Sequence, residues 1–244
     1  MRIATLMMAL LLSAGALSAQ QRDAERWAAL LDNPSNTIRQ AAVDSLGRAG
    51  AAAVPPLVLR LADSVQDRRY WAAVALIRVG PAGSEAVPAL ITTLLGSDRA
   101  VRTRAAAALG AIGASSVLPL TRVVADSATQ FWGAMALSRL GPHLEPALPA
   151  LITALDHGDA VARAEVILAI GEWGRPVPAA IPGMVRALAI ADPWLRTRAA
   201  IILPQMGADA RAALPALQAL LDDANPDVRA RAAEAIAAIR EPRE

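Results

Sequence analysis

The chain has 244 residues, and 55% of them are hydrophobic, which is ample material for a buried core. The isoelectric point is about 10.2, yet the formal net charge is only +2, because 24 basic residues face 22 acidic ones. All the basic residues are arginines, and with no cysteine, one tyrosine and two histidines little titrates between the carboxylates and arginine. The high isoelectric point therefore does not indicate a nucleic-acid-binding surface, and we expect no nucleic-acid partner. The lack of cysteine excludes a disulfide framework and thiolate chemistry.

Residues 1–19 have the pattern of a secretory signal peptide. A single arginine precedes the apolar run Ile3–Leu12, and small residues follow it. We expect cleavage after Ala19, with Ala16 as the alternative site. An uncleaved anchor or a first helix of the fold are the other interpretations, but the run is short for spanning a bilayer. Cleavage predicts a periplasmic or secreted domain over residues 20–244, without stable membrane insertion.

Glycines recur at a nearly constant spacing through the rest of the chain. The last three lie 33 residues apart, and prolines keep the same step. Such a period is typical of helical solenoids, in which a single repeat cannot bury its apolar face alone. The sequence therefore predicts about seven two-helix repeats. Each ends at one of these positions: Gly50, Gly80, Gly113, Gly141, Gly174 and Gly207, with Arg240 in the last position.

Each predicted repeat contains two helices with their own start signals. The first begins near a Val-Pro or Leu-Pro pair, as at Val87 and Pro88, because proline suits the first helical turn. The second begins at a residue that can cap it, and the glycine ends it. The predicted capping residues are Asp98, Asp159, Asp192 and Asn225.

The second helices carry an apolar stripe with helical spacing. Small residues within the stripe allow neighbouring helices to approach closely. In the third repeat the stripe consists of Val101, Ala105, Ala108, Leu109 and Ile112. In the seventh it consists of Val228, Ala232, Ala235, Ile236 and Ile239.

The segments 98–110 and 227–233 resemble HEAT repeats, and they are most similar to the short, alanine-rich bacterial kind also seen in phycobilin-lyase-like proteins. The resemblance covers roughly residues 22–240 and is strongest in repeats 3, 5, 6 and 7. It implies an all-α fold of the α-α superhelix class, a HEAT-type solenoid whose second helices line a concave surface. Ankyrin repeats share the 33-residue step, but their Thr-Pro-Leu-His element is missing.

An arginine recurs one residue past the start of the stripe in six of the seven repeats. One interpretation is an anion-binding ladder. The other, which the HEAT resemblance implies and which we favour, is that each arginine pairs with the turn aspartate of its own or the next repeat. These recurring arginines are Arg39, Arg69, Arg102, Arg163, Arg196 and Arg229, and the fourth repeat has Gln130 instead.

No catalytic constellation is evident. His143 and His157 are the two histidines, and their spacing does not suit a metal site. HEAT-repeat iron hydroxylases carry paired His-Glu dipeptides, which this chain lacks. A phosphate-binding loop and a nucleophile elbow are also missing. We therefore expect no cofactor, no metal and no enzymatic activity.

Two tryptophans occupy the same position beside the stripe, where the HEAT resemblance places the concave groove. Tryptophan, arginine and methionine are enriched in protein interfaces, so this strip predicts a groove for a protein or peptide. The alternative is that both tryptophans fill gaps between repeats. Trp173 is predicted to lie in the core, and Trp194 to pack at a turn. The predicted groove residues are Trp71, Arg78, Arg104, Trp132, Met135, Arg139, Arg198 and Arg231.

Taken together, these features favour a non-catalytic binding scaffold outside the cytoplasm. A lyase-like or chaperone-like protein acting on a protein substrate is the first alternative, by analogy with bilin lyases. Resemblance of fold does not transfer activity, and a signal peptide argues against a cytosolic pigment pathway. A structural envelope spacer is the second alternative. The identity of the partner and the oligomeric state stay open.

Overall fold

The computed structural model describes residues 19–241, which form helices joined by short turns, without a β-strand in that range. The chain forms two compact units that divide between Pro119 and Leu120, inside α7 (Ala114–Ala125). The signal peptide predicted over residues 1–19 lies outside the described residues, apart from Ala19. The fold class is the predicted one, an all-α solenoid of two-helix repeats.

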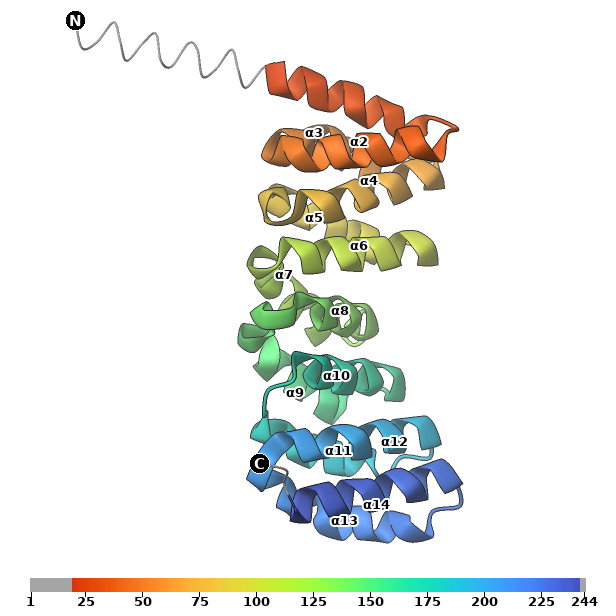
Figure 1. Cartoon of the computed structure of the whole chain (residues 1–244), viewed down its shortest axis with the longest axis vertical. Coiled ribbons are helices and arrows are strands. Elements are labelled where there is room, and N and C mark those ends of the chain that lie inside the picture. The colour runs from red at the N-terminus through yellow and green to blue at the C-terminus, as the bar shows by residue number, and fades with distance from the viewer. Residues whose placement is uncertain (1–18, 242–244) are drawn as a thin grey trace, which may run out of the picture. The chain divides into compact units, whose positions relative to one another are not determined.

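The N-terminal unit contains repeats 1 to 3. Its second helices pack on one another in the order α2, α4, α6, and α3 contacts α5 in a second layer (Figure 1). The hairpins are helix 19–29 with α2 (Asn36–Ala49), α3 (Val54–Leu61) with α4 (Gln66–Val79), and α5 (Val87–Leu94) with α6 (Arg99–Ile112). Short 3-10 segments lie between them at η1 (Leu30–Asp32), η2 (Gly50–Ala53) and η3 (Gly80–Ala86).

The C-terminal unit contains repeats 5 to 7 and α8 of repeat 4. The second helices α8, α10, α12 and α14 again pack in order, and α9 contacts α11 (Figure 1). The helices are α8 (Gln130–Leu137), α9 (Leu148–His157), α10 (Ala160–Trp173), α11 (Ile181–Ala187), α12 (Pro193–Ile202), α13 (Leu214–Ala219) and α14 (Pro226–Arg240). The 3-10 segments are η4 (Ser138–Ala147), η5 (Pro178–Ala180), η6 (Leu203–Ala213) and η7 (Leu220–Asp222).

The predicted repeat boundaries are confirmed by the backbone. Among the described residues, a positive φ occurs only at the six glycines that were predicted to end a repeat. Gly80, for example, has φ 61° and ψ −137°, a region that side-chain-bearing residues avoid. Gly174 differs, because its φ of 67° and ψ of 15° are those of the left-handed helix. In four repeats the second α-helix therefore ends directly before such a glycine: α2, α4, α6 and α10. In α8 and α12 a 3-10 segment follows the α-helix and contains the glycine, and α14 ends at Arg240.

The apolar stripes form the core, as predicted. Every stripe residue named for the third and seventh repeats is buried. Ala105 and Ala108 have no exposed surface, because α6 packs directly against α4. A larger side chain at either alanine would push the two helices apart. The close helix contacts thus depend on the alanine-rich composition.

The predicted helix caps are confirmed at three of four positions. Asp159, Asp192 and Asn225 accept hydrogen bonds from backbone N–H groups of the following turn at 2.7, 2.9 and 2.9 Å. The prediction for Asp98 is wrong, because its side chain makes no capping bond to α6. The Asp98 carboxylate instead accepts a charged hydrogen bond from Arg69 of the preceding repeat.

The recurring arginines close the turn between the two helices of their own repeat. Arg196 Nη1, for example, donates to the carbonyl oxygens of Ile190 and Ala191, both at 2.8 Å. The last carbonyls of a helix have no partner within the helix, so a guanidinium satisfies groups that would otherwise need water. All six arginines donate to backbone carbonyls of their own turn: Arg39, Arg69, Arg102, Arg163, Arg196 and Arg229.

The favoured interpretation, that each arginine pairs with a turn aspartate, is confirmed at two of the six positions. Arg69 binds Asp98, and Arg196 binds Asp223. The guanidinium groups are therefore engaged within the fold, which does not favour the anion-ladder interpretation. Gln130 takes the arginine position in repeat 4 and is buried. It lies beside Gly158, because a Cβ added to that glycine would be 2.6 Å from the Oε1 of Gln130.

One helical stretch of the described residues, 66–94, is long and apolar enough to cross a membrane by length and composition. It comprises α4 and α5, and Gly80 turns the chain between them. The core helices of soluble proteins pass the same test, so this stretch is weak evidence for a membrane span.

Candidate protein-binding surface

In the N-terminal unit, Trp71 lies on α4 and is half-buried. Its ring faces the guanidinium of Arg39 on α2, with 4.9 Å between Cζ and the ring centroid. The Nε of Arg39 is buried without a hydrogen-bond partner, so the tryptophan face supplies a favourable contact to this cation. Trp71 thus bridges two repeats on one side and stays partly accessible on the other.

The neighbouring ring of Tyr70 extends this contact to the third repeat. Tyr70 meets Trp71 edge to face, with centroids 5.6 Å apart. Arg104 of α6 lies over Tyr70 at 5.3 Å, and its Nε donates to the tyrosine hydroxyl at 3.0 Å. Arg39, Trp71, Tyr70 and Arg104 therefore form a continuous series across α2, α4 and α6, which we name the aromatic ladder. Tyr70 was not among the predicted groove residues, although its position beside Trp71 could have indicated it.

Arg78, the third predicted groove residue of this unit, is exposed near the C-terminal end of α4. Its Nε lies 3.2 Å from Asp44 Oδ1 on α2. Gly47 on α2 leaves room for this arrangement, since an added Cβ would collide with the Arg78 side chain. Trp71, Arg78 and Arg104 therefore each contact a residue of the preceding second helix.

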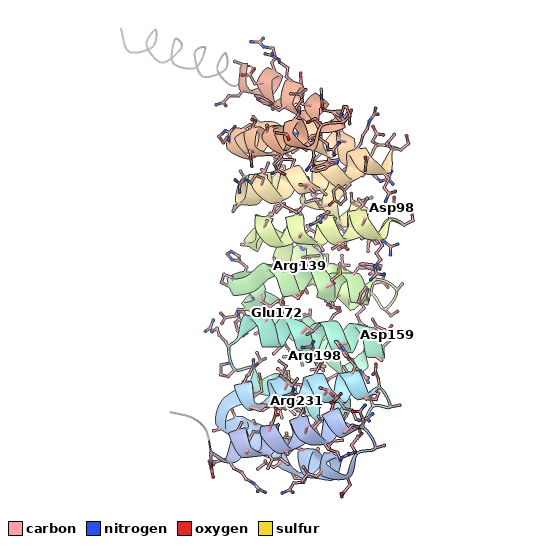
Figure 2. All side chains as sticks on the ribbon, turned by 45° about the vertical axis from the view of Figure 1, so that its right-hand side comes forward. Asp98, Arg139, Asp159, Glu172, Arg198 and Arg231 are labelled. Atoms are coloured by element: carbon pink, nitrogen blue, oxygen red, sulfur yellow. The ribbon has the colours of Figure 1, made fainter. Side chains whose placement is uncertain are left out.

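In the C-terminal unit, the predicted residues of α8 and η4 are partly accessible. Trp132 and Met135 are half-buried, and Arg139 is exposed. The Trp132 ring meets Phe131 edge to face at 4.7 Å. Figure 2 shows Arg139, Arg198 and Arg231 along the middle of this unit in that view. The half-burial of Trp71 and Trp132 is compatible with both interpretations of these tryptophans, and the groove stays a prediction.

Acidic residues interrupt this face on α10. Glu165 takes the position that Trp132 has on α8, and it is half-buried. Burial is the main cause that raises the pKa of its carboxyl group, Arg139 opposes this shift, and Glu172 adds to it. The face of the C-terminal unit therefore alternates in charge, a feature that the search for tryptophan and arginine did not predict.

Arg198 and Arg231 contact residues of their own helices. Arg198 lies over the Trp194 ring at 5.3 Å, and Arg231 Nη1 donates to Glu234 at 2.6 Å. Trp194 lies in the first turn of α12, where it packs on Arg198 and stays exposed. These intrahelical contacts hold both guanidinium groups at the surface.

The prediction that Trp173 lies in the core is wrong. Its side chain is half-buried, and Arg175 lies over its ring at 4.8 Å. The left-handed conformation of Gly174 lets the chain leave α10 differently from the other repeats, and the ring faces an open cavity of about 290 Å³. Within residues 19–241, no group of three or more His, Cys, Asp or Glu side chains could hold a metal ion.

Comparison with known families agrees with this architecture. A sequence model of HEAT repeats matches residues 148–237, which hold α9 to most of α14. A second model, of the PBS lyase HEAT-like repeat, matches residues 101–126. The chain therefore contains HEAT-type repeats in residues 101–126 and 148–237. No curated protein sequence matches this HEAT-repeat chain significantly.

Several solved structures are similar to this chain over most of its length. A computationally designed armadillo repeat protein for modular peptide recognition is 19% identical, with 88% of this chain and 98% of that chain covered and a TM-score of 0.43. Human deoxyhypusine hydroxylase is 24% identical, with coverages of 95% and 91% and a TM-score of 0.40. The CpcE–CpcF complex of phycocyanin lyase from Nostoc sp. is 24% identical, with coverages of 88% and 94% and a TM-score of 0.42. Similarity at this level concerns the fold alone.

Proposed function

We propose that this HEAT-repeat chain is a non-catalytic scaffold that binds a protein or peptide on the face formed by its second helices. The aromatic ladder is the observation that carries the proposal. Its rings and guanidinium groups are held in place by one another, yet Trp71 and Tyr70 remain partly accessible and Arg104 is exposed. Side chains that are already ordered lose little entropy when a partner binds, and tryptophan and arginine are common energetic centres of interfaces.

The C-terminal unit supports the same role with a different surface. Trp132 and Met135 offer apolar area beside the exposed Arg139, and Glu165 and Glu172 follow on α10. A partner segment that contacts this face would need both acidic and basic side chains, because potentials across an interface tend to be complementary. The alternation of charge would therefore restrict the choice of partner and its register.

We also propose that the protein acts outside the cytoplasm, in the periplasm or as a secreted protein. The proposal rests on the sequence pattern of residues 1–19. N-terminal sequencing of the protein from its host should find Gln20 as the first residue. Soluble protein that retains Met1 would contradict this location.

A comparative affinity capture tests the binding role. The wild-type chain and the variants Trp71→Ala, Trp132→Ala and Trp27→Ala would each be used as bait on the envelope fraction of the host. Trp27 is a matched control, because it is an exposed tryptophan on helix 19–29, outside the second-helix face. The proposal predicts one protein that is retained by the wild type and Trp27→Ala and is reduced with Trp71→Ala or Trp132→Ala. Equal retention by all four baits would contradict it, and would favour a structural spacer.

A lyase-like or chaperone-like role is the second candidate, and the match of residues 101–126 to the PBS lyase HEAT-like repeat favours it. The two roles differ in what happens to the partner after it binds. A scaffold would hold its captured partner in a stable complex, whereas a lyase-like protein would change the partner covalently and release it. Mass spectrometry of the partner before and after incubation with the chain distinguishes them.

A further inference from the structure

The last repeat exposes a leucine that the equivalent positions of other repeats bury. This leucine lies eight residues before the recurring arginine. In five repeats it is at most 4% exposed: Leu31, Leu61, Leu94, Leu155 and Leu188. In repeat 7 the equivalent residue is Leu221, which is 43% exposed. Repeat 7 is the last repeat in the described residues.

The junction between repeats 2 and 3 shows which residue of the next repeat lies near the leucine. Leu61 of repeat 2 and Val101 of repeat 3 line the same cavity of about 320 Å³, together with Arg69 and Asp98. Val101 is the residue directly before the recurring arginine of its repeat. At this junction, the leucine of one repeat therefore lines a cavity with the residue before the recurring arginine of the following repeat.

The first repeat exposes the other half of such a junction. The residue before the recurring arginine is at most 1% exposed in four repeats: Val101, Ala162, Leu195 and Val228. In repeat 1 it is Ile38, which is 40% exposed. In repeat 2 it is Arg68, whose Nε lies 3.4 Å from Asp32 of repeat 1, so this position faces the preceding repeat there too. Ile38 and Leu221 are therefore complementary positions at the two ends of the repeat series.

Charged residues at the two ends repeat an ion pair of the interior. Asp44, five residues after Arg39, binds Arg78 of the next repeat. Repeat 7 has Glu234 at the position of Asp44, and repeat 1 has Arg48 at the position of Arg78. Both side chains are exposed and bound within their own helices, since Arg48 donates to Ser45 at 2.9 Å and Glu234 accepts from Arg231 at 2.6 Å.

We propose that the outer face of repeat 7 binds the outer face of repeat 1 of a second copy of this chain, head to tail. Leu221 then lies beside Ile38, as Leu61 and Val101 line one cavity, and Glu234 binds Arg48 as Asp44 binds Arg78. The outer faces of terminal solenoid repeats are normally polar, and two exposed apolar residues at core positions depart from that rule. The contact joins two different surfaces, so it can extend into open chains of copies. It uses neither the aromatic ladder nor Trp132, and it stands apart from the proposed function.

Sedimentation velocity of the purified full chain at increasing concentrations measures this association. We expect the wild type to show species larger than a monomer whose share grows with concentration. Leu221→Arg should weaken the association at least about tenfold, because it places a charge where an apolar contact is needed. Leu59→Arg is the matched control, since Leu59 is 76% exposed on α3 and has no part in the proposed contact.

A pair of charge reversals tests the register of the contact. Arg48→Glu and Glu234→Arg each place like charges at the junction between identical copies, so each variant alone should associate less than the wild type. In an equimolar mixture, the substituted end of one variant meets the substituted end of the other with opposite charges, and the remaining two ends carry the original pair. Mixing should therefore restore association. Both substituted positions are exposed, so this arm of the test does not depend on whether Leu221→Arg folds.

Three results would overturn the proposal. The first is a wild-type chain that stays monomeric over the whole concentration range. The second is an equal loss of association with Leu59→Arg and Leu221→Arg. The third is a mixture of the two charge-reversal variants that associates no better than either variant alone.

Discussion

Arg196 on α12 binds its own turn and the next repeat at the same time. One terminal nitrogen donates to the carbonyl oxygens of Ile190 and Ala191, and the other donates to Asp223 Oδ1 at 2.8 Å. The side chains of Arg196 and Asp223 are 12% and 9% exposed, so water competes little for this pair. Arg196, which binds the turn of its own repeat, therefore also joins two repeats.

Replacing Arg196 with methionine should destabilise the C-terminal unit. The change keeps most of the side-chain volume but leaves two carbonyls and one carboxylate without their donor. Hydrogen bonds to a charged group contribute about 1.5–3 kcal/mol, so we expect a loss of about 2 kcal/mol or more in the free energy of unfolding. Urea denaturation followed by circular dichroism measures it. Arg211→Met, at an exposed position of η6, should change the free energy by less than about 0.5 kcal/mol, and an equal loss in both variants would contradict the role of Arg196.

The same pair predicts a loss of stability in acid. The hydrogen bond from Arg196 is the main cause that lowers the pKa of the Asp223 carboxyl group below its ordinary value of 3.8. A carboxyl group whose pKa is lower in the folded state stabilises the fold fully above its unfolded pKa, and this contribution is lost as the pH falls through the folded pKa. We expect Asp223→Asn to be less stable than the wild type at pH 7, with a difference that shrinks below about pH 3.8. A difference that stays constant down to pH 2 would show that the ion pair is not its source.

Glu165 predicts a pH dependence of the opposite sign. Burial raises the pKa of this carboxyl group above its ordinary value of 4.5, so the folded state favours the protonated form. Stability should therefore fall as the pH rises above 4.5 towards the higher folded pKa. Glu165→Gln removes the buried charge, and we expect it to be more stable than the wild type at pH 7 but not at pH 4. Thermal melts at the two pH values measure this, and a variant that is less stable at pH 7 would show that the electrostatic attraction of Arg139 outweighs burial.

Much of the fold could be predicted from the sequence because the repeat has strict steric requirements. The backbone at Gly80 and its equivalents has φ values that favour glycine, so glycines mark the repeat boundaries in the sequence itself. The alanine-rich stripe is likewise visible, since helices that touch along their whole length have little room for larger residues.

Several side-chain contacts could not be predicted in the same way. The sequence does not show that the recurring arginines bind backbone carbonyls, because carbonyls are present at every position. Asp98 has the right residue type for a cap, but the preceding repeat offers Arg69 as a stronger partner. Trp173 follows the core spacing, yet the left-handed Gly174 after it opens the end of α10. Only the outcome at Asp98 depends on a distant residue, since Arg69 lies 29 residues before it.

The variant Trp71→Ala distinguishes a binding surface from packing between repeats, because its folding stability and its affinity for the partner can both be measured. Trp71→Ala removes the contact with the guanidinium of Arg39, which contributes roughly 1 kcal/mol to stability. A fully buried tryptophan would cost roughly 3–5 kcal/mol instead. Because repeat arrays unfold in parts, hydrogen exchange of α2, α4 and α6 should be followed rather than one melting midpoint.

The most direct test of the proposed function is the dissociation constant of the captured partner, measured by titration calorimetry for the wild type and for Trp71→Ala. We expect Trp71→Ala to bind at least about tenfold more weakly while hydrogen exchange across α2, α4 and α6 changes little. An unchanged dissociation constant, together with a large loss of protection in these helices, would show that Trp71 serves packing between repeats and would contradict the proposed binding surface.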